Sequence, residues 1–189
     1  MVHHTTLTGF KWIARAPKLA FGYEEAIGFC PNPQIARDKD GIASSVVAAS
    51  LFAALKVEGR TAWDELDRLA HAHGLHVTGP LTFRVEEIEQ IATGMARLRA
   101  QPPSELAGSP VVEVSDLSEG YQGLPPTDGV LVLTKAGDRV IARPSGTEPK
   151  LKCYLEVILS APKGEPVPWE AARERLELIK SEFGRIIGL

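Results

Sequence analysis

The residues best suited to bind an anion lie together in the segment 143–150, which reads Arg-Pro-Ser-Gly-Thr-Glu-Pro-Lys. Arg143 offers a planar, permanently charged fork of hydrogen-bond donors. Ser145 and Thr147 add hydroxyl groups, and Gly146 lets backbone N–H groups approach an anion closely. The two prolines stiffen the ends of the loop, so less conformational entropy is lost on binding. These residue types favour phosphate binding, and the alternative is a polar turn whose arginine lies in solvent.

The same loop resembles the phosphate-binding loop in the last domain of the phosphohexomutases, which include phosphoglucomutases, phosphomannomutases and phosphopentomutases. In that family the loop holds the phosphate of the sugar substrate. Three further segments resemble family loops in the required order: residues 8–12 (Thr-Gly-Phe-Lys-Trp), 22–28 (Gly-Tyr-Glu-Glu-Ala-Ile-Gly) and 37–41 (Arg-Asp-Lys-Asp-Gly). The resemblance covers most of the chain. It is closest to the phosphoglucomutase-2/phosphopentomutase branch and related bacterial phosphomannomutases.

The resemblance implies a set of substrate-binding residues: Thr8, Gly9, Lys11, Glu24, Glu25, Arg143, Ser145, Gly146 and Thr147. A carboxylate such as Glu24 can accept hydrogen bonds from two sugar hydroxyls. Adjacent residues cannot share one face, so one of the two glutamates is expected to be structural or exposed. Many family members have a serine where this chain has Ala26, which leaves the identity of the sugar open.

Lys39 is the catalytic residue that the resemblance implies. It would stabilise the transferring phosphoryl group as a point charge or assist proton transfer. The alternative is a plain salt bridge with Asp38 or Asp40. Lys11 and Lys150 have an equally ordinary alternative, namely a lysine that lies in solvent.

The resemblance implies a phosphosugar mutase, an intramolecular phosphotransferase that interconverts a sugar 1-phosphate and a 6- or 5-phosphate. In the family, a phosphoserine in the first domain donates its phosphoryl group, and Mg²⁺ in an Asp-x-Asp-x-Asp-Arg loop neutralises developing charge. This sequence contains neither a serine followed by His-Asn-Pro nor such a loop. We therefore expect that this chain binds no Mg²⁺ and has no turnover alone, its upstream domains being lost or carried by another chain. The alternatives are a non-catalytic phosphosugar-binding protein and a structural remnant.

The elements around these loops predict three regions. Residues 1–58 are expected to be the end of an α/β domain, the third, sugar-binding domain of a phosphohexomutase, with a helix over 41–55 that is buried over much of its surface. Residues 59–103 are expected to be a helical connecting segment, with a strand near 75–85 that Gly79-Pro80 interrupts. Residues 104–189 are expected to form an α+β phosphate-binding domain, a sheet covered by helices. Apolar residues alternate along its strand 150–159, and a helix over 169–187 closes the chain with Leu176, Ile179, Phe183 and Ile186 inward.

The composition of the chain argues against several classes of function. A formal charge of −3 argues against general nucleic-acid binding, which needs a basic surface. No stretch reaches the roughly 20 apolar residues needed to cross a bilayer, and the first residues contain no basic segment followed by an apolar one. Cys30 and Cys153 lack the spacing of a metal site or a disulfide framework, so they are expected to be reduced, buried thiols. Together these features predict a cytoplasmic protein without a membrane or nucleic-acid partner.

Overall fold

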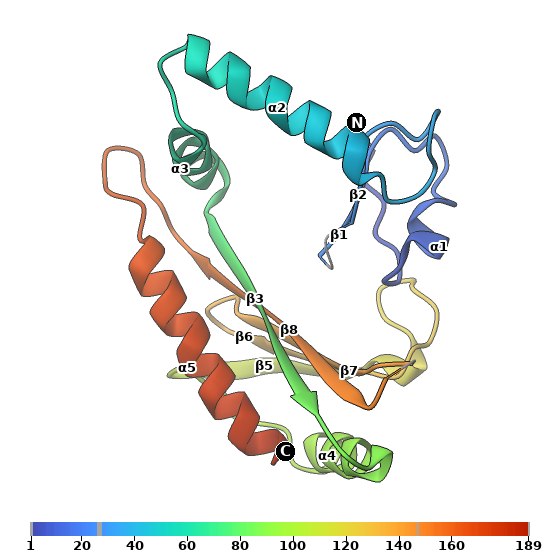
Figure 1. Ribbon diagram of the computed structural model, residues 1–189. Helices are drawn as coiled ribbons and strands as arrows, with labels where there is room; N and C mark the ends of the chain where they lie inside the picture. The colour runs from blue at the N-terminus through green and yellow to red at the C-terminus, as the bar shows by residue number, and fades with distance from the viewer. Residues whose placement is uncertain (1, 26–27, 147, 189) are drawn as a thin grey trace. The chain divides into compact units, whose positions relative to one another are not determined.

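The computed structural model of the protein describes residues 2–25, 28–146 and 148–188 (Figure 1). Contacts between residues divide the chain into two compact units, 1–66 and 67–189, and the division falls within helix α3 (Ala62–His73). Helix α3 ends before Gly74, whose φ of 89° is a left-handed conformation that favours glycine. The domain limits expected at residues 58 and 103 stay predictions.

The first unit has a short helix, a two-stranded hairpin and one long helix: α1 (Phe10–Ile13), β1 (Gly22–Glu24), β2 (Gly28–Cys30) and α2 (Gly41–Val57). The strands β1 and β2 pair antiparallel, so that Gly22 lies opposite Cys30 and Glu24 lies opposite Gly28. The buried core of this unit is small and consists of Phe10, Ile13 and Cys30, with Leu19 packed against it.

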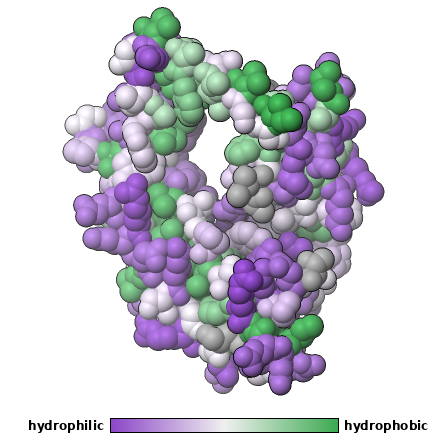
Figure 2. Space-filling view, viewed as in Figure 1, coloured by the Kyte–Doolittle hydropathy of each residue, from purple (hydrophilic) through white to green (hydrophobic). Residues whose placement is uncertain are grey.

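Helix α2 forms where the sequence predicts it, but the expectation that it is buried is wrong. Asp40 begins the helix, because its Oδ1 accepts a hydrogen bond from the backbone N–H of Ala43 at 2.9 Å. Leu55 is the buried residue of this helix, whereas Ile42 is 84% and Val57 89% exposed. Figure 2 shows the apolar residues of α2 gathered in green along the helix. The core of the first unit is too small to cover a helix of this length.

No single described helix has the length and apolar composition needed to span a membrane; α2 and α3, a sharply bent pair, meet that test only when taken together.

The second unit is built on one antiparallel sheet of six strands in the order β3-β8-β7-β6-β5-β4. Its elements after α3 are β3 (Leu75–Arg84), α4 (Ile88–Ala100), β4 (Glu105–Leu106), β5 (Ser109–Asp116), η1 (Leu117–Glu119), β6 (Val130–Thr134), β7 (Arg139–Pro144), β8 (Lys150–Leu159) and α5 (Trp169–Ile187). Helix α5 contacts β3 and β8, and α4 contacts β6, β8 and α5. The expected mixed α/β fold, a sheet flanked by helices, is confirmed (Figure 1).

The side chains of strand β8 alternate between the two faces of this sheet. As predicted, its residues Leu151, Cys153, Leu155 and Val157 share one face, and all four are buried in the core under the helices. Helix α5 adds Leu176, Ile179 and Phe183 to that core, and its last buried residue is Ile187, whereas Ile186 is only partly buried. The side chains of Lys150, Lys152, Tyr154 and Glu156 therefore lie on the opposite face of the sheet.

Strand β3 runs without a break through Gly79-Pro80, so the expected interruption is wrong. Every residue from Leu75 to Arg84 has a register partner on β8. Proline is tolerated because β3 is an edge strand, where one side of the backbone needs no partner. Gly79 is required by packing, since a Cβ atom there would lie 2.9 Å from Leu176 Cδ2 on helix α5.

One buried ion pair joins the sheet to helix α5. The Asp138 carboxylate, which is fully buried, accepts hydrogen bonds from Arg175 Nε at 2.8 Å, Arg175 Nη2 at 2.7 Å and Thr134 Oγ1 at 2.7 Å. Burial raises the pKa of Asp138, but the hydrogen bonds from Arg175 and Thr134 outweigh burial and hold the pKa below its usual value. Arg175 also donates to the carbonyl of Ala107, so it ties the β6–β7 and β4–β5 turns to α5.

We predict that Arg175→Met lowers the free energy of unfolding by about 3 kcal/mol at neutral pH, because it leaves the Asp138 carboxylate buried and unpaired. A depressed folded-state pKa stabilises the protein above the unfolded-state pKa, and this stabilisation disappears as pH falls through the folded-state value. The deficit should therefore shrink below about pH 4. Urea denaturation followed by circular dichroism measures both effects, with Arg173→Met on the same helix as the control. A deficit that is independent of pH, or equal in the control, would contradict the assignment.

Candidate functional site

The predicted phosphate loop connects β7 to β8 in the second unit. Its ends are joined by a backbone hydrogen bond from Ser145 N–H to the carbonyl of Lys150 at 2.8 Å, and Lys150 N–H donates to the carbonyl of Glu148 at 2.7 Å. Arg143 and Ser145 are half-buried, and Gly146 is exposed. Thr147 lies outside the described residues. The loop is therefore a closed turn between two paired strands, with its arginine at the end of β7.

Gly146 is not required by the local backbone or by packing. Its φ is not positive, and a Cβ atom added there would meet nothing within 4 Å. Gly79 is the opposite case, because an atom of α5 fills the space beside it. The space beside Gly146 is open, so a ligand can approach the backbone of the loop there.

The pairing of β7 with β8 determines the direction of the arginine. Val140 and Ala142 of β7 point into the core, so Arg143 lies on the opposite face of the sheet. Arg143 is the register partner of Lys152 on β8, and Lys152 is in turn the partner of Thr82 on β3. Residues opposite each other in an antiparallel sheet point to the same side.

Four cations consequently gather where β7, β8 and β3 meet the loop: Arg84, Arg143, Lys150 and Lys152, here called the basic corner. Arg84 is the register partner of Lys150, next to the pair of Arg143 and Lys152. Like charges placed opposite each other across a sheet repel, so this arrangement costs stability unless an anion lies between them. Within the described ranges, Arg84, Arg143 and Lys152 have no carboxylate within ion-pair distance.

Glu148, from the loop itself, is the carboxylate that contacts the basic corner. Lys150 Nζ lies 2.5 Å from Glu148 Oε1, and the Lys150 side chain is only 13% exposed. The hydrogen bond and the charge of Lys150 lower the pKa of Glu148, and the charges of Lys152 and Arg84 lower it further. Lys150 therefore does not lie free in solvent, which was the alternative expected from the sequence.

Sequence reasoning did not select Lys152 or Arg84. The signal for Lys152 was present, because Lys150 and Lys152 alternate with the predicted inward residues of β8 and must share the outer face with Arg143. Arg84 carried no such signal, because its place beside Lys150 depends on the register of β3 against β8.

In the first unit, two of the predicted site residues lie side by side. Lys39 Nζ lies 3.7 Å from Glu24 Oε1 and 4.0 Å from Asp38 Oδ1. The same ammonium group lies 5.3 Å from the centre of the Phe10 ring. The Glu24 side chain is 10% exposed, whereas Glu25 is exposed, so the two glutamates differ as expected. Asp40 is instead used to begin helix α2.

The other predicted residues of this unit flank the short helix α1. The carbonyl of Gly9 accepts a hydrogen bond from Trp12 N–H at 2.9 Å, and its φ of 112° suits a glycine. Lys11 Nζ lies 5.5 Å from the centre of the Trp12 ring, which Arg15 also approaches. Thr8 is exposed, and Ala26 lies outside the described residues.

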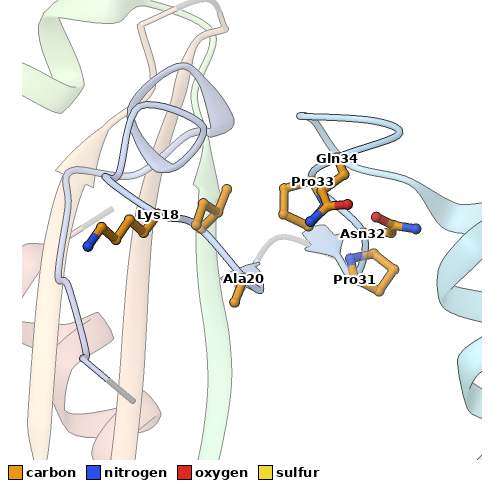
Figure 3. Close-up of a pocket in the computed structure, with 7 residues that line it drawn as sticks. Lys18, Ala20, Pro31, Asn32, Pro33 and Gln34 are labelled. Atoms are coloured by element: carbon orange, nitrogen blue, oxygen red, sulfur yellow. The ribbon is translucent and has the colours of Figure 1, made fainter.

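A pocket of about 430 Å³ in the first unit does not coincide with these residues. It is lined by Lys18, Leu19, Ala20 and the segment 31–34. Figure 3 shows the Lys18 side chain directed away from that segment, so the pocket offers a ligand no convergent charge. It carries little of the chemistry that a phosphosugar needs.

The remaining reactive side chains have structural roles. Cys30 and Cys153 are reduced and buried, as predicted, and burial raises the pKa of the Cys153 thiol to about 12. His71 lies 3.0 Å from the carbonyl of Ala161, and His76 lies 3.2 Å from Glu156. Among residues 2–25, 28–146 and 148–188, no three His, Cys, Asp or Glu side chains are grouped to hold a metal.

Comparison with known proteins bears on both units. Residues 53–167 match the family model described as phosphoglucomutase/phosphomannomutase, C-terminal domain. The chain is 40% identical over 158 residues to a probable phosphomannomutase of Haemophilus influenzae, covering 84% of this chain and 32% of that protein. It is 29% identical over 200 residues to the human phosphopentomutase, covering 93% of this chain and 32% of the relative. The chain therefore spans about a third of the length of these relatives.

A solved structure has a similar fold. The crystal structure of the Paramecium exocytosis-sensitive phosphoprotein parafusin, a phosphoglucomutase in an open form, superposes with a TM-score of 0.51. The match covers 81% of this chain and 28% of that protein, at 17% identity, which is evidence for the fold alone. The family model covers more than half of the chain, and the chain accordingly belongs to the phosphoglucomutase/phosphomannomutase family.

Proposed function

We propose that this chain binds the phosphate of a sugar phosphate at the basic corner, as the substrate-binding part of a phosphosugar mutase. The observation that carries the proposal is the cluster of Arg143, Lys150 and Lys152 on one face of the sheet, beside a loop that an approaching anion can reach. Arg143 has no carboxylate partner among the described residues, so its five donors are available to a phosphate. The family membership supports a sugar phosphate over another anion.

In this proposal, the residues of the loop and of the basic corner contact the phosphate in different ways. The Arg143 guanidinium binds two phosphate oxygens in parallel, and the hydroxyls of Ser145 and Thr147 donate to the same group. Gly146 leaves room for the phosphate to reach the backbone N–H groups. Lys150, Lys152 and Arg84 act as point charges that attract the dianion.

We propose the sugar contacts separately, from the residues of the first unit that the family resemblance implies. Glu24 accepts hydrogen bonds from sugar hydroxyls, and the neighbouring Lys39 supplies a positive charge to the transferring phosphoryl group. The remaining residues, proposed as weaker contacts, are Thr8, Gly9, Lys11 and Glu25. The sugar itself is not assigned, because Ala26 replaces the serine that many family members carry.

The residues of this chain do not fit the magnesium site that the family implies. Asp38 and Asp40 are only two carboxylates, and one of them begins helix α2. No described residues form a group of three metal-binding side chains. We therefore assign no step of the reaction to a metal held by this chain, and we propose that the 189 residues bind phosphosugars without turning them over. The buried, reduced cysteines are consistent with a cytoplasmic location.

We predict that Arg143→Ala weakens the binding of a sugar phosphate by about 10- to 150-fold, because a charge-assisted hydrogen bond contributes roughly 1.5–3 kcal/mol. Isothermal titration calorimetry with glucose 1-phosphate, mannose 1-phosphate and ribose 1-phosphate measures the change. Arg139→Ala is the matched control, because Arg139 lies on the same face of β7 and pairs with Glu156 instead. Equal affinities for the wild type and Arg143→Ala would refute the phosphate site.

We also predict that Gly146→Ala leaves the free energy of unfolding within about 0.5 kcal/mol of the wild type, because the added Cβ meets no atom. The same methyl group should weaken phosphosugar binding, since it occupies the side from which a ligand approaches the loop. Thermal denaturation and calorimetry of the same sample separate the two effects. An affinity like that of the wild type would place the ligand elsewhere.

We predict that this chain alone has no mutase turnover. A coupled assay for glucose 1-phosphate to glucose 6-phosphate conversion, with added glucose 1,6-bisphosphate and Mg²⁺, should give no rate above background for this chain. Adding the part of a relative that precedes its match to this chain, namely the first two domains and the start of the third, should restore a rate if the chain is the substrate-binding part of a mutase. Binding without any restored rate would favour the alternative class, a non-catalytic phosphosugar-binding protein.

A further inference from the structure

We propose that Glu148 is an internal counter-ion that occupies the basic corner until a dianionic ligand displaces it, so that the corner selects dianions over monoanions. This inference rests on the proposed phosphate site and adds a specificity-determining residue to it.

The contacts of Glu148 place it in competition with a ligand. Its carboxylate contacts Lys150 Nζ at 2.5 Å and is close enough to Lys152 and Arg84 to interact with their charges. These are the charges that a bound phosphate would use beside Arg143. A ligand that binds all four cations therefore competes with Glu148 for Lys150.

The carboxylate can leave without unfolding the loop. Two backbone hydrogen bonds, Ser145 N–H to Lys150 O and Lys150 N–H to Glu148 O, hold the chain on either side of it. The Glu148 side chain is 47% exposed, so rotation about its side-chain bonds carries the carboxylate into water. Neither of these backbone hydrogen bonds involves the Glu148 side chain, so the exchange does not require them to break.

Charge decides which ligands can make the exchange. The four cations of the corner face one carboxylate, which leaves a formal charge of 4 − 1 = +3 among these five residues. A monoanion that replaces Glu148 restores only the charge that it displaces, whereas a dianion brings one negative charge more. A phosphate monoester has a second pKa near 6 and is a dianion at pH 8, while a sulfate ester of the same sugar stays a monoanion.

The test compares glucose 6-phosphate with glucose 6-sulfate at pH 8, titrated calorimetrically into the wild type and Glu148→Gln. Glutamine keeps the size of the side chain and removes its charge. We expect Glu148→Gln to tighten the binding of the sulfate by about fivefold, the size of one exposed ion pair. The affinity for glucose 6-phosphate, which already displaces Glu148, should rise less than the affinity for the sulfate. The ratio of the two affinities should therefore be smaller in Glu148→Gln than in the wild type. Glu156→Gln, on the same outer face, is the control and should leave the preference unchanged.

A double-mutant cycle adds a second measurement. In a Lys150→Met background, Glu148→Gln should change the preference less, because the principal partner of Glu148 is gone.

Two results would overturn the inference alone. Weaker binding of both ligands by Glu148→Gln would mean that Glu148 holds Lys150 in position for the phosphate, and an unchanged preference would mean that Glu148 does not compete. In both cases the wild type would still bind glucose 6-phosphate, and Arg143→Ala would still bind it more weakly than the wild type. Wild-type binding that does not depend on Arg143 would instead refute the proposed phosphate site, and this inference with it.

Discussion

The antiparallel pairing of β7 with β8 is the constraint on which the second unit depends. One register, with Arg143 opposite Lys152 and Ala142 opposite Cys153, assigns alternate side chains to the two faces of the sheet. A shift of one residue would turn the basic side chains into the core and the apolar ones into water. The burial of Leu151, Cys153 and Leu155 under the helices therefore also holds the cations of the basic corner together, although these cations repel one another.

The second unit uses two arginines in opposite ways. Arg175 donates hydrogen bonds to the Asp138 carboxylate and to the carbonyl of Ala107, and these bonds join α5 to the sheet. Arg143 lies on the other face of the same sheet, at the end of a strand, and no described carboxylate pairs with it. The positive charges of Arg143, Lys150 and Lys152 repel one another, and the single carboxylate of Glu148 offsets only part of that repulsion, which a bound anion would offset further. This contrast is the physical reason why we propose Arg143, and not Arg175, as the arginine that binds phosphate.

Local patterns predicted the elements of the fold well, and contacts between distant segments explain what they missed. The period of β8 identified its buried face, and the apolar spacing located α2 and α5. The burial of α2 was overestimated, because an apolar pattern states what a helix could bury and not whether a partner surface is present. The path of β3 through Gly79-Pro80 was missed, because edge position and the approach of Leu176 are properties of the assembled sheet. For the same reason, the loop residues of the candidate site were found from the sequence, whereas Arg84 was not.

The proline in β3 has a consequence for the behaviour of the protein at high concentration. An exposed strand edge offers a row of N–H and C=O groups on which a strand of another molecule can add, which is how amyloid growth begins. Pro80 removes one donor near the middle of β3, and at the opposite edge of the sheet β4 is only two residues long. The β3 margin is therefore a poor template for an added strand, and the proline that looked like a strand breaker protects this edge of the finished sheet.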